Sequence, residues 1–308
     1  MRILIWGAGG IGCYYGARLQ TAGHQVVYVG RGAHLRAMQD IGLQVEHEGF
    51  SFQQPVVAVE QQALLRDYRC EDFDLIVLTL KCAATEALLS EAQAWLKQGD
   101  CPLLSLQNGV ENEPQIAATV GNARTLGGLA VRIGGHILEP GRVEAKGIAQ
   151  VVLGSWPRQQ NNSGDNFVDQ LKLVFDRAGI PTTVSADIER ELWRKLLINN
   201  GVNPLSALTG LDTRQLTAHS AYGPVVYKMM EETRVAANQQ GVALQQSDVD
   251  EMFKLISEFD AIKTSMLVDQ EKGRALELDG ISGAVIRRCQ LSKRPALFTE
   301  LIVALLNK

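Results

Sequence analysis

The chain lacks the cysteine and histidine patterns that build disulfide frameworks or zinc sites. Its 308 residues include five cysteines and five histidines, and no C-x-x-C motif or Cys/His pairing occurs among them. The cysteines are Cys13, Cys70, Cys82, Cys101 and Cys289, and the histidines are His24, His34, His47, His136 and His219. Scattered, odd-numbered thiols are typical of a reduced, cytoplasmic protein, and the spacing predicts no metal site.

The chain also has no excess of positive charge, and it has no long apolar run. The formal net charge is -4 and the pI is about 5.8, with acidic and basic residues mixed along the chain, which argues against nucleic acid as a partner. The apolar start MRILIW breaks into glycine too early for a signal peptide, and no later run has the length of a membrane span. We therefore expect a cytoplasmic protein that does not enter the membrane.

What the chain does have is enough apolar sequence for two domains. It is 46% hydrophobic and 21% charged, and its 308 residues are more than a domain with a single hydrophobic core usually contains. Residues 1–186 alternate short apolar runs with helical stretches, which is typical of βαβ units on a parallel sheet. Parallel strands are expected over residues 3–6, 25–29, 75–80 and 103–106.

Two further stretches of the first half alternate apolar and polar residues, as antiparallel strands do. The first covers residues 43–60 around a turn at His47-Glu48-Gly49, and the second covers residues 129–156 with breaks at Gly134-Gly135 and Pro140-Gly141. The first domain is therefore predicted to contain a mixed sheet. Residues 159–166 read as a polar loop, and residues 187–308 show long helical periodicity with almost no strand pattern, which predicts an all-helical second domain.

A glycine-rich turn follows the first expected strand and opens the first expected helix. The turn is Gly7-Ala8-Gly9-Gly10-Ile11-Gly12. In a dinucleotide-binding fold such glycines permit a tight turn, close approach of the backbone to the pyrophosphate, and close packing of helix on strand. The position at a strand-to-helix junction favours dinucleotide binding over an ordinary glycine-rich turn.

Three polar residues near the ends of later strands are further candidates for cofactor binding. Arg31 follows the second strand where NAD enzymes usually carry an acid for the ribose 2'-hydroxyl, and a guanidinium there suits a 2'-phosphate. This favours NADPH over NADH, although an ordinary surface arginine is the simpler interpretation. Lys81 and Asn108 follow the strands over 75–80 and 103–106, and each is either a ligand contact or a solvated loop residue.

The stretch ELWRKLLINNGVNPLSAL, residues 191–208, predicts a helix with a polar row on its buried side. Lys195, Asn199 and Asn203 recur at intervals of four and so share one face. Buried polar groups need partners, so these three contact a ligand or bond to backbone carbonyls at a domain interface. Pro204 is expected to bend or end the helix, because it has no backbone N–H.

The whole chain resembles the ketopantoate reductase (2-dehydropantoate 2-reductase) family. The resemblance rests on six segments in the family's order: GAGGIGCYYGARLQTAGHQV, VLTLKC, SLQNGVENE, EPGRVEAKG, ELWRKLLINNGVNPLSALTG and SMLVDQEKGRALELDGISGAV. It implies an α/β N-terminal Rossmann-type domain over 1–186 that binds NADP. An all-helical substrate and catalytic domain over 187–308, of the 6-phosphogluconate-dehydrogenase-like type, would follow, with the active site between the two.

The resemblance also implies roles for individual residues. The family's catalytic lysine corresponds to Lys195 and its catalytic acid to Glu277. The polar residues of the substrate site correspond to Asn108, Asn199, Asn203 and Ser265. In such an enzyme the lysine protonates or polarises the carbonyl oxygen as negative charge builds there, and the carboxylate supports the lysine. The implied reaction is NADPH-dependent reduction of ketopantoate to pantoate in pantothenate and coenzyme A biosynthesis.

Some positions depart from the family's pattern near the substrate end of the predicted cleft. Val268 replaces glutamine in the segment SMLVD, and Ser282 stands where asparagine is usual. A reductase of another small branched 2-keto acid is therefore an alternative, and a non-catalytic NADPH sensor is a second one. The composition is compatible with a homodimer formed through the helical half, and equally with a monomer.

Overall fold

The chain forms two compact units. The computed structural model describes residues 1–158 and 166–307, so the polar loop expected over 159–166 lies almost wholly outside the described residues. The first unit comprises Met1–Gln107 and Asn112–Ile188, and the second comprises Asn108–Glu111 and Glu189–Lys308. The first unit carries both sheets of the described chain, and the second is built from helices.

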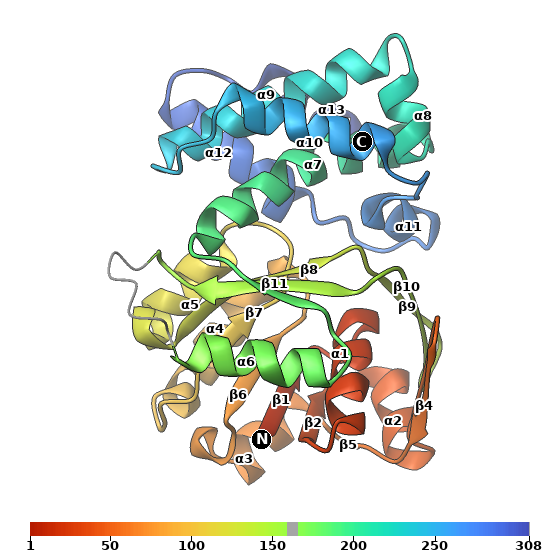
Figure 1. Ribbon diagram of the computed structural model, residues 1–308, viewed down its shortest axis with the longest axis vertical. Helices are drawn as coiled ribbons and strands as arrows, with labels where there is room; N and C mark the ends of the chain where they lie inside the picture. The colour runs from red at the N-terminus through yellow and green to blue at the C-terminus, as the bar shows by residue number, and fades with distance from the viewer. Residues whose placement is uncertain (159–165, 308) are drawn as a thin grey trace. The chain divides into compact units, whose positions relative to one another are not determined.

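The first unit is organised around an eight-stranded mixed sheet (Figure 1). Its order is β12-β11-β8-β7-β6-β1-β2-β5, and every neighbouring pair is parallel except β8 with β11. The strands are β1 (Arg2–Trp6), β2 (Gln25–Val29), β5 (Val57–Val59), β6 (Leu75–Leu78), β7 (Leu103–Ser105), β8 (Thr125–Val131), β11 (Gln150–Ser155) and β12 (Thr182–Val184). The four parallel strands expected from the apolar runs are confirmed.

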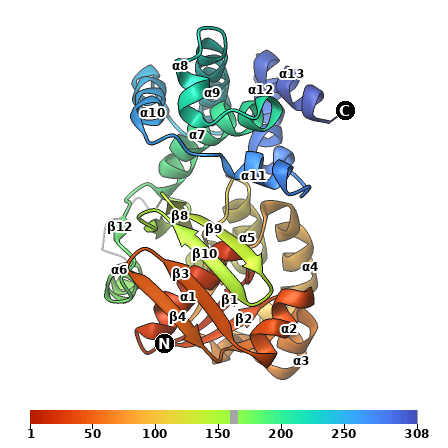
Figure 2. The same cartoon turned by 90° about the vertical axis from the view of Figure 1, so that its right-hand side faces the viewer.

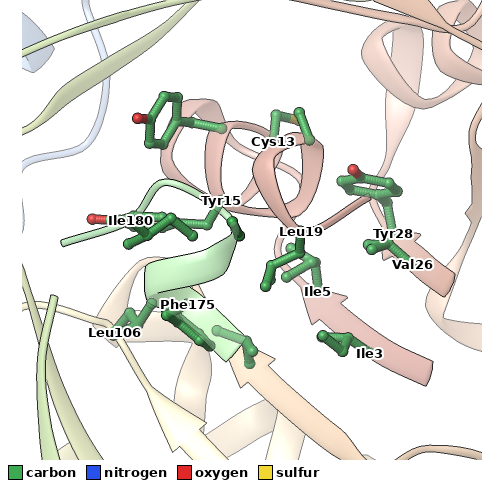
Figure 3. Packing of buried hydrophobic residues seen from close by; sticks show 14 of the residues in the cluster. Ile3, Ile5, Cys13, Tyr15, Leu19, Val26, Tyr28, Leu106, Phe175 and Ile180 are labelled. Carbon is green, nitrogen blue, oxygen red and sulfur yellow. The ribbon is translucent and has the colours of Figure 1, made fainter. Parts of the chain in front are cut away.

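Both faces of this sheet are buried, because alternate residues of each strand point to opposite sides. Ile3 and Ile5 of β1 pack with Leu19 of α1 and Phe175 of α6 on one face (Figure 3), while Trp6 packs with α4 on the other. The first face is covered by α1 (Gly10–Thr21), α2 (Gly32–Asp40) and α6 (Asn166–Arg177), and the second by α3 (Gln61–Asp67), α4 (Thr85–Leu96) and α5 (Asn112–Val120).

A second, four-stranded sheet covers α1. Its order is β4-β3-β10-β9, formed by β3 (Leu43–His47), β4 (Phe50–Gln54), β9 (Gly134–Glu139) and β10 (Arg142–Lys146). Figure 2 shows this sheet lying across α1. The hairpin turn at Glu48-Gly49 and the turn at Pro140-Gly141 are confirmed, with positive φ angles of 71° at Gly49 and 82° at Gly141.

The break expected at Gly134-Gly135 is wrong, because both glycines belong to β9 and the chain turns at Arg132 and Ile133 instead. Glycine is required at position 135 because β9 passes against α1: a Cβ on Gly135 would lie 2.7 Å from the carbonyl carbon of Gly10. Gly135 therefore marks a close approach of two backbones within a strand.

The strand order places a topological switch point at β1. The chain passes from β1 to β2 on one side and later returns to β6 on the other side of β1. Loops that follow β1 and β6 at such a point form the ligand crevice of open α/β sheets. In this unit these loops carry the glycine-rich turn and Lys81.

All the regular elements in the described part of the second unit are helices, as expected. Its elements are α7 (Ile188–Thr209), α8 (Thr213–Ala218), α9 (Tyr222–Gln239), α10 (Gln246–Glu258), α11 (Ser265–Glu271), a π-helical turn (Asp279–Gly283), α12 (Ala284–Leu291) and α13 (Leu297–Leu306). The longest of them, α7, packs against α9 where Gly201 leaves room for Met230, whose Cγ would lie 2.9 Å from a Cβ at that position.

Pro204 does not end α7. The helix runs on for five residues past the proline, to Thr209. Proline removes one intrahelical hydrogen bond, but the residues around it are buried, so tertiary packing holds the helix together across the gap. Of the two outcomes expected at Pro204, a helix end is therefore wrong, and a bend stays a prediction.

Candidate functional site

The glycine-rich turn is fixed to the strands on both sides of it. The backbone N–H groups of Gly7 and Ala8 donate to the Val29 carbonyl at 3.2 and 2.8 Å, and the Thr79 hydroxyl donates to the Gly7 carbonyl at 2.7 Å. Gly7 has a φ of 119°, which a residue with a side chain rarely adopts. The turn from β1 into α1 is thus a rigid element joined to β2 and to the loop after β6.

Three of the four glycines in this turn are required by packing. A Cβ on Gly7 would lie 2.6 Å from the Leu80 nitrogen, one on Gly10 would lie 2.2 Å from the Gly135 carbonyl carbon, and one on Gly12 would lie 2.2 Å from the Gly7 oxygen. A Cβ on Gly9 would have no atom within 4 Å. Gly9 therefore borders open space at the start of α1.

This open space suits the pyrophosphate of a dinucleotide. The N-cap residue of α1 is Gly9, and no side chain caps the helix. The first N–H groups of a helix have no intrahelical partner, and the helix dipole favours negative charge there. Gly7, Ala8, Gly9, Gly10, Ile11 and Gly12 thus form a backbone cradle that fits a dinucleotide phosphate.

Arg31 and Lys81 lie where the sequence placed them, after β2 and β6. Arg31 is the N-cap residue of α2 and is exposed, and its guanidinium makes no ion pair or hydrogen bond within residues 1–158 and 166–307. Lys81 is exposed at the start of a short 3-10 turn, Cys82–Ala84. Both charges belong to the same unit as the glycine-rich turn.

A buried hydrogen-bond chain supports the ends of β6 and β7. The Gln107 amide donates to the Leu80 carbonyl at 3.0 Å and to the Thr85 hydroxyl at 2.8 Å, and that hydroxyl donates to Asn112 Oδ1 at 2.9 Å. The sequence analysis missed Gln107, although it follows the same strand as Asn108. The chain joins Gln107 and Asn112, the two residues that flank segment 108–111.

The polar row of α7 lies on the helix as predicted, but its members differ in burial. Lys195 and Asn199 are half-buried, and Asn203 is buried with 5% of its surface exposed. All three belong to the helical unit. A half-buried amine next to a half-buried amide can meet a small polar ligand while staying anchored on a rigid helix.

Asn200, the neighbour of Asn199, has a purely structural environment that the sequence analysis did not foresee. It is fully buried, and its amide donates to the hydroxyls of Thr233 and Thr299 at 3.0 and 3.1 Å, while Ser282 donates to its Oδ1 at 2.8 Å. Asn200 therefore joins α7 to α9, α13 and the π-helical turn. No sequence signal distinguished it from Asn199, because the two amides are adjacent and only the helix's neighbours decide their roles.

Glu277 and Ser265 occupy different surroundings within the helical unit. Ser265 is exposed as the first residue of α11. Glu277 is half-buried and lies in an irregular segment just before the π-helical turn. Single π-helical turns occur often at functional sites.

Asn108 belongs to the helical unit, although it follows a strand of the first unit. Segment Asn108–Glu111 groups with Glu189–Lys308 by its contacts. The predicted substrate and catalytic residues thus fall in one compact unit: Asn108, Lys195, Asn199, Asn203, Ser265 and Glu277. The predicted cofactor residues other than Asn108 fall in the other unit.

Metal-binding clusters and membrane-spanning helices are two further features to consider in the described residues. Within residues 1–158 and 166–307, no group of three or more His, Cys, Asp or Glu side chains could hold a metal ion. In the same part of the chain, no helix combines the length and the apolarity that crossing a membrane requires.

A Rossmann-like α/β unit with a glycine-rich turn after its first strand, followed by a helical unit, is an arrangement that dinucleotide-dependent oxidoreductases use. Family models place the chain within this class. The model described as "Ketopantoate reductase PanE/ApbA" matches residues 3–158, and the one described as "Ketopantoate reductase PanE/ApbA C terminal" matches residues 187–308. The chain belongs to the ketopantoate reductase family.

Individual relatives cover the full length of the chain. A 2-dehydropantoate 2-reductase of Pyrococcus horikoshii is 30% identical over 100% of this chain and 97% of its own. The crystal structure of a 2-dehydropantoate 2-reductase from Geobacter metallireducens superposes with a TM-score of 0.86 at 28% identity, covering 100% and 99% of the two chains. A ternary structure of D-mandelate dehydrogenase with NADH and anilino(oxo)acetate shares the fold, with a TM-score of 0.87 at 23% identity and coverage of 100% and 97%.

Proposed function

We propose that this protein reduces ketopantoate to pantoate with NADPH, in the biosynthesis of pantothenate and coenzyme A. The observation that carries the proposal is the row of Lys195, Asn199 and Asn203 on one face of α7, with a half-buried amine, in a chain that matches both parts of the family. An amine and two amides one turn apart on the same helix face can contact one small polar ligand together.

Lys195 is the proposed general acid. Bound nicotinamide supplies a hydride, and negative charge then develops on the substrate's carbonyl oxygen. A fixed ammonium beside that oxygen stabilises the charge and provides the proton. Glu277, half-buried before the π-helical turn, is the proposed carboxylate that supports the lysine.

The amides and the hydroxyl are proposed to hold the substrate. Asn199 and Asn203 follow Lys195 by one and two turns, and amides both donate and accept hydrogen bonds, so they suit carboxylate and hydroxyl oxygens. Asn108 and Ser265 complete the proposed set. Such positioning on a rigid helix lowers the entropic part of the barrier.

The first unit is proposed to bind the cofactor. The open space at Gly9 and the uncapped start of α1 suit the pyrophosphate, while Lys81 and Asn108 are proposed to contact the bound cofactor further along. Arg31 supports NADPH over NADH, because an exposed guanidinium at the end of β2 can form paired hydrogen bonds to a 2'-phosphate.

The direct test is to follow NADPH absorbance with ketopantoate and with a close 2-keto acid that lacks its hydroxyl group. We expect the specificity constant to be higher for ketopantoate, since a site built to bond a hydroxyl rejects the analogue without it. Absence of turnover of ketopantoate by pure, folded protein would remove the proposal.

The same assay separates the alternatives. A reductase of another branched 2-keto acid would prefer a different member of a keto-acid panel, and a sensor would bind NADPH tightly without oxidising it. One observation weakens the first alternative. Ser282, which departs from the family's pattern, is fully buried and donates a hydrogen bond to Asn200. This departure therefore affects packing inside the helical unit and is no evidence for a different substrate.

A further inference from the structure

Segment 108–111 belongs to the helical unit as a short loop whose last residue, Glu111, is held by two arginines. Glu111 Oε2 accepts from Arg287 Nη2 at 2.7 Å, and Glu111 Oε1 accepts from Arg288 Nη1 at 2.8 Å. The Glu111 side chain is 28% exposed and that of Arg288 is 12% exposed, so the second ion pair is shielded from solvent. Each carboxylate oxygen therefore has its own charged donor.

Arg287 continues the contact to the turn that follows Glu277. Its Nη1 donates to Asp279 Oδ1 at 2.6 Å, and Asp279 begins the π-helical turn. Gly283 closes this turn without a side chain, since a Cβ there would lie 2.6 Å from Asp279 Oδ1 and 3.0 Å from Arg287 Nη1. The absence of a side chain at Gly283 leaves room for the Arg287–Asp279 ion pair.

Arg288 continues the contact to α7. Its guanidinium carbon lies 5.4 Å from the ring centroid of Trp193, two residues before Lys195, and its Nε donates to Gln240 Oε1 at 2.9 Å. A guanidinium over a buried indole is held by a cation–π attraction as well as by its hydrogen bonds. Glu111 is thus connected through two arginines to the segments that carry Glu277 and Lys195.

We infer that Glu111 is a positioning residue, which sets Asn108 in register with Lys195 and Glu277. The inference rests on the proposed function for its kinetic consequence. Two residues, Gly109 and Val110, separate Asn108 from Glu111, and Gln107 and Asn112 on either side are joined through Thr85, so what freedom the loop has lies between these two ends. The two arginines remove that freedom.

The kinetic test is Glu111→Gln, which keeps the shape and removes the charge. We expect kcat/KM for the keto acid to fall about 10-fold, because small displacements of a positioning group are costly to rate, while NADPH affinity stays within about 2-fold. In an Asn108→Ala background the same change should cost less than about 2-fold, because Glu111 acts through Asn108. Equal losses in both backgrounds would overturn the inference.

A matched control removes a similar charge from the same unit. Glu258, whose side chain is 68% exposed, pairs with Lys254 at 3.9 Å on α10, and Glu258→Gln should leave kcat/KM unchanged. If Glu111→Gln folds poorly, Arg287→Gln removes one of the two donors from a side chain that is 44% exposed, and should lower kcat/KM in the same direction.

Amide hydrogen exchange tests the inference without any enzymatic activity. Peptides covering 108–111 and 277–283 should exchange faster in Glu111→Gln than in the parent protein, and at parental rates in Glu258→Gln. Unchanged exchange in both segments would overturn the positioning role. Absence of turnover by the parent protein would overturn the proposed function instead, so the two failures are distinguishable.

Discussion

The two units hold their candidate groups in different ways. The first unit presents backbone: a turn whose glycines are fixed by close packing, with one glycine that borders open space. The second presents side chains, arranged by the period of a single helix and by ion pairs from α12. The comparison teaches that the open backbone at Gly9 depends on where a side chain is absent, whereas the polar row of α7 depends on which side chains share one face of the helix.

Removing the amine of Lys195 tests most directly whether the two units have different roles. Lys195→Ala should lower kcat by roughly 10³-fold, since general acid catalysis and charge stabilisation are lost together, while NADPH affinity changes by less than about 2-fold. Steady-state kinetics and fluorescence titration with NADPH measure the two quantities. Lys254→Ala, at a 73% exposed lysine of the same unit, is the control and should behave as the parent protein.

Two adjacent glycines of the first unit distinguish a packing role from a cofactor-binding role. Gly10→Ala places a Cβ 2.2 Å from the Gly135 carbonyl carbon and should lower the free energy of unfolding by about 2 kcal/mol or more. Gly9→Ala meets no protein atom, so it should keep the parental stability and weaken NADPH binding about 10-fold. Thermal melts with and without NADPH distinguish them. A destabilised Gly9→Ala with normal affinity would contradict the cradle.

Arg31 tests whether the first unit selects its cofactor by charge. Arg31→Ala should reduce the preference for NADPH over NADH by about 10-fold, because a phosphate contact to a guanidinium contributes on the order of 1–2 kcal/mol. The ratio of kcat/KM values for the two cofactors measures this. Equal loss with both cofactors would mean that Arg31 does not read the 2'-phosphate.

The smallest expected effect concerns pH and His34, on α2 of the first unit. Burial lowers the pKa of His34, and its Nδ1 accepts a hydrogen bond from the Gly141 N–H at 3.0 Å, so the folded state favours the neutral ring. The unfolded chain takes up a proton at about pH 6.5, above the folded pKa. The stabilisation is therefore complete above pH 6.5 and is lost as the pH falls through the folded pKa.

Urea titrations at several pH values check this prediction. His34→Asn keeps a short acceptor without a titrating group, and should show a weaker fall in stability between pH 7 and 5 than the parent protein. Burial also lowers the pKa of His24, beside the terminal amine, so the comparison uses the difference between the two proteins. Parallel curves would show that His34 does not contribute.

Local patterns predicted the parallel strands and the helical second half because each depends on residues close in the chain. The runs at β1, β2, β6 and β7 are continuous and apolar, as strands buried on both faces must be. The expected end of α7 at Pro204 failed for a tertiary reason, since burial holds the helix across the missing hydrogen bond. The sequence also did not predict that the strands at 43–54 and 134–146 form a second sheet, because pairing of β3 with β10 joins residues about 100 positions apart.

By itself, the sequence determined the order of strands and helices, the glycine-rich turn and the polar row of α7, because each follows from spacing within a few residues. Only the tertiary structure decided that Asn200 is a core hub while Asn199 is half-buried, and that segment 108–111 joins the helical unit through Glu111. The burial of each asparagine and the position of segment 108–111 depend on contacts with residues far away in the chain. The spacing of residues along the sequence does not predict such contacts.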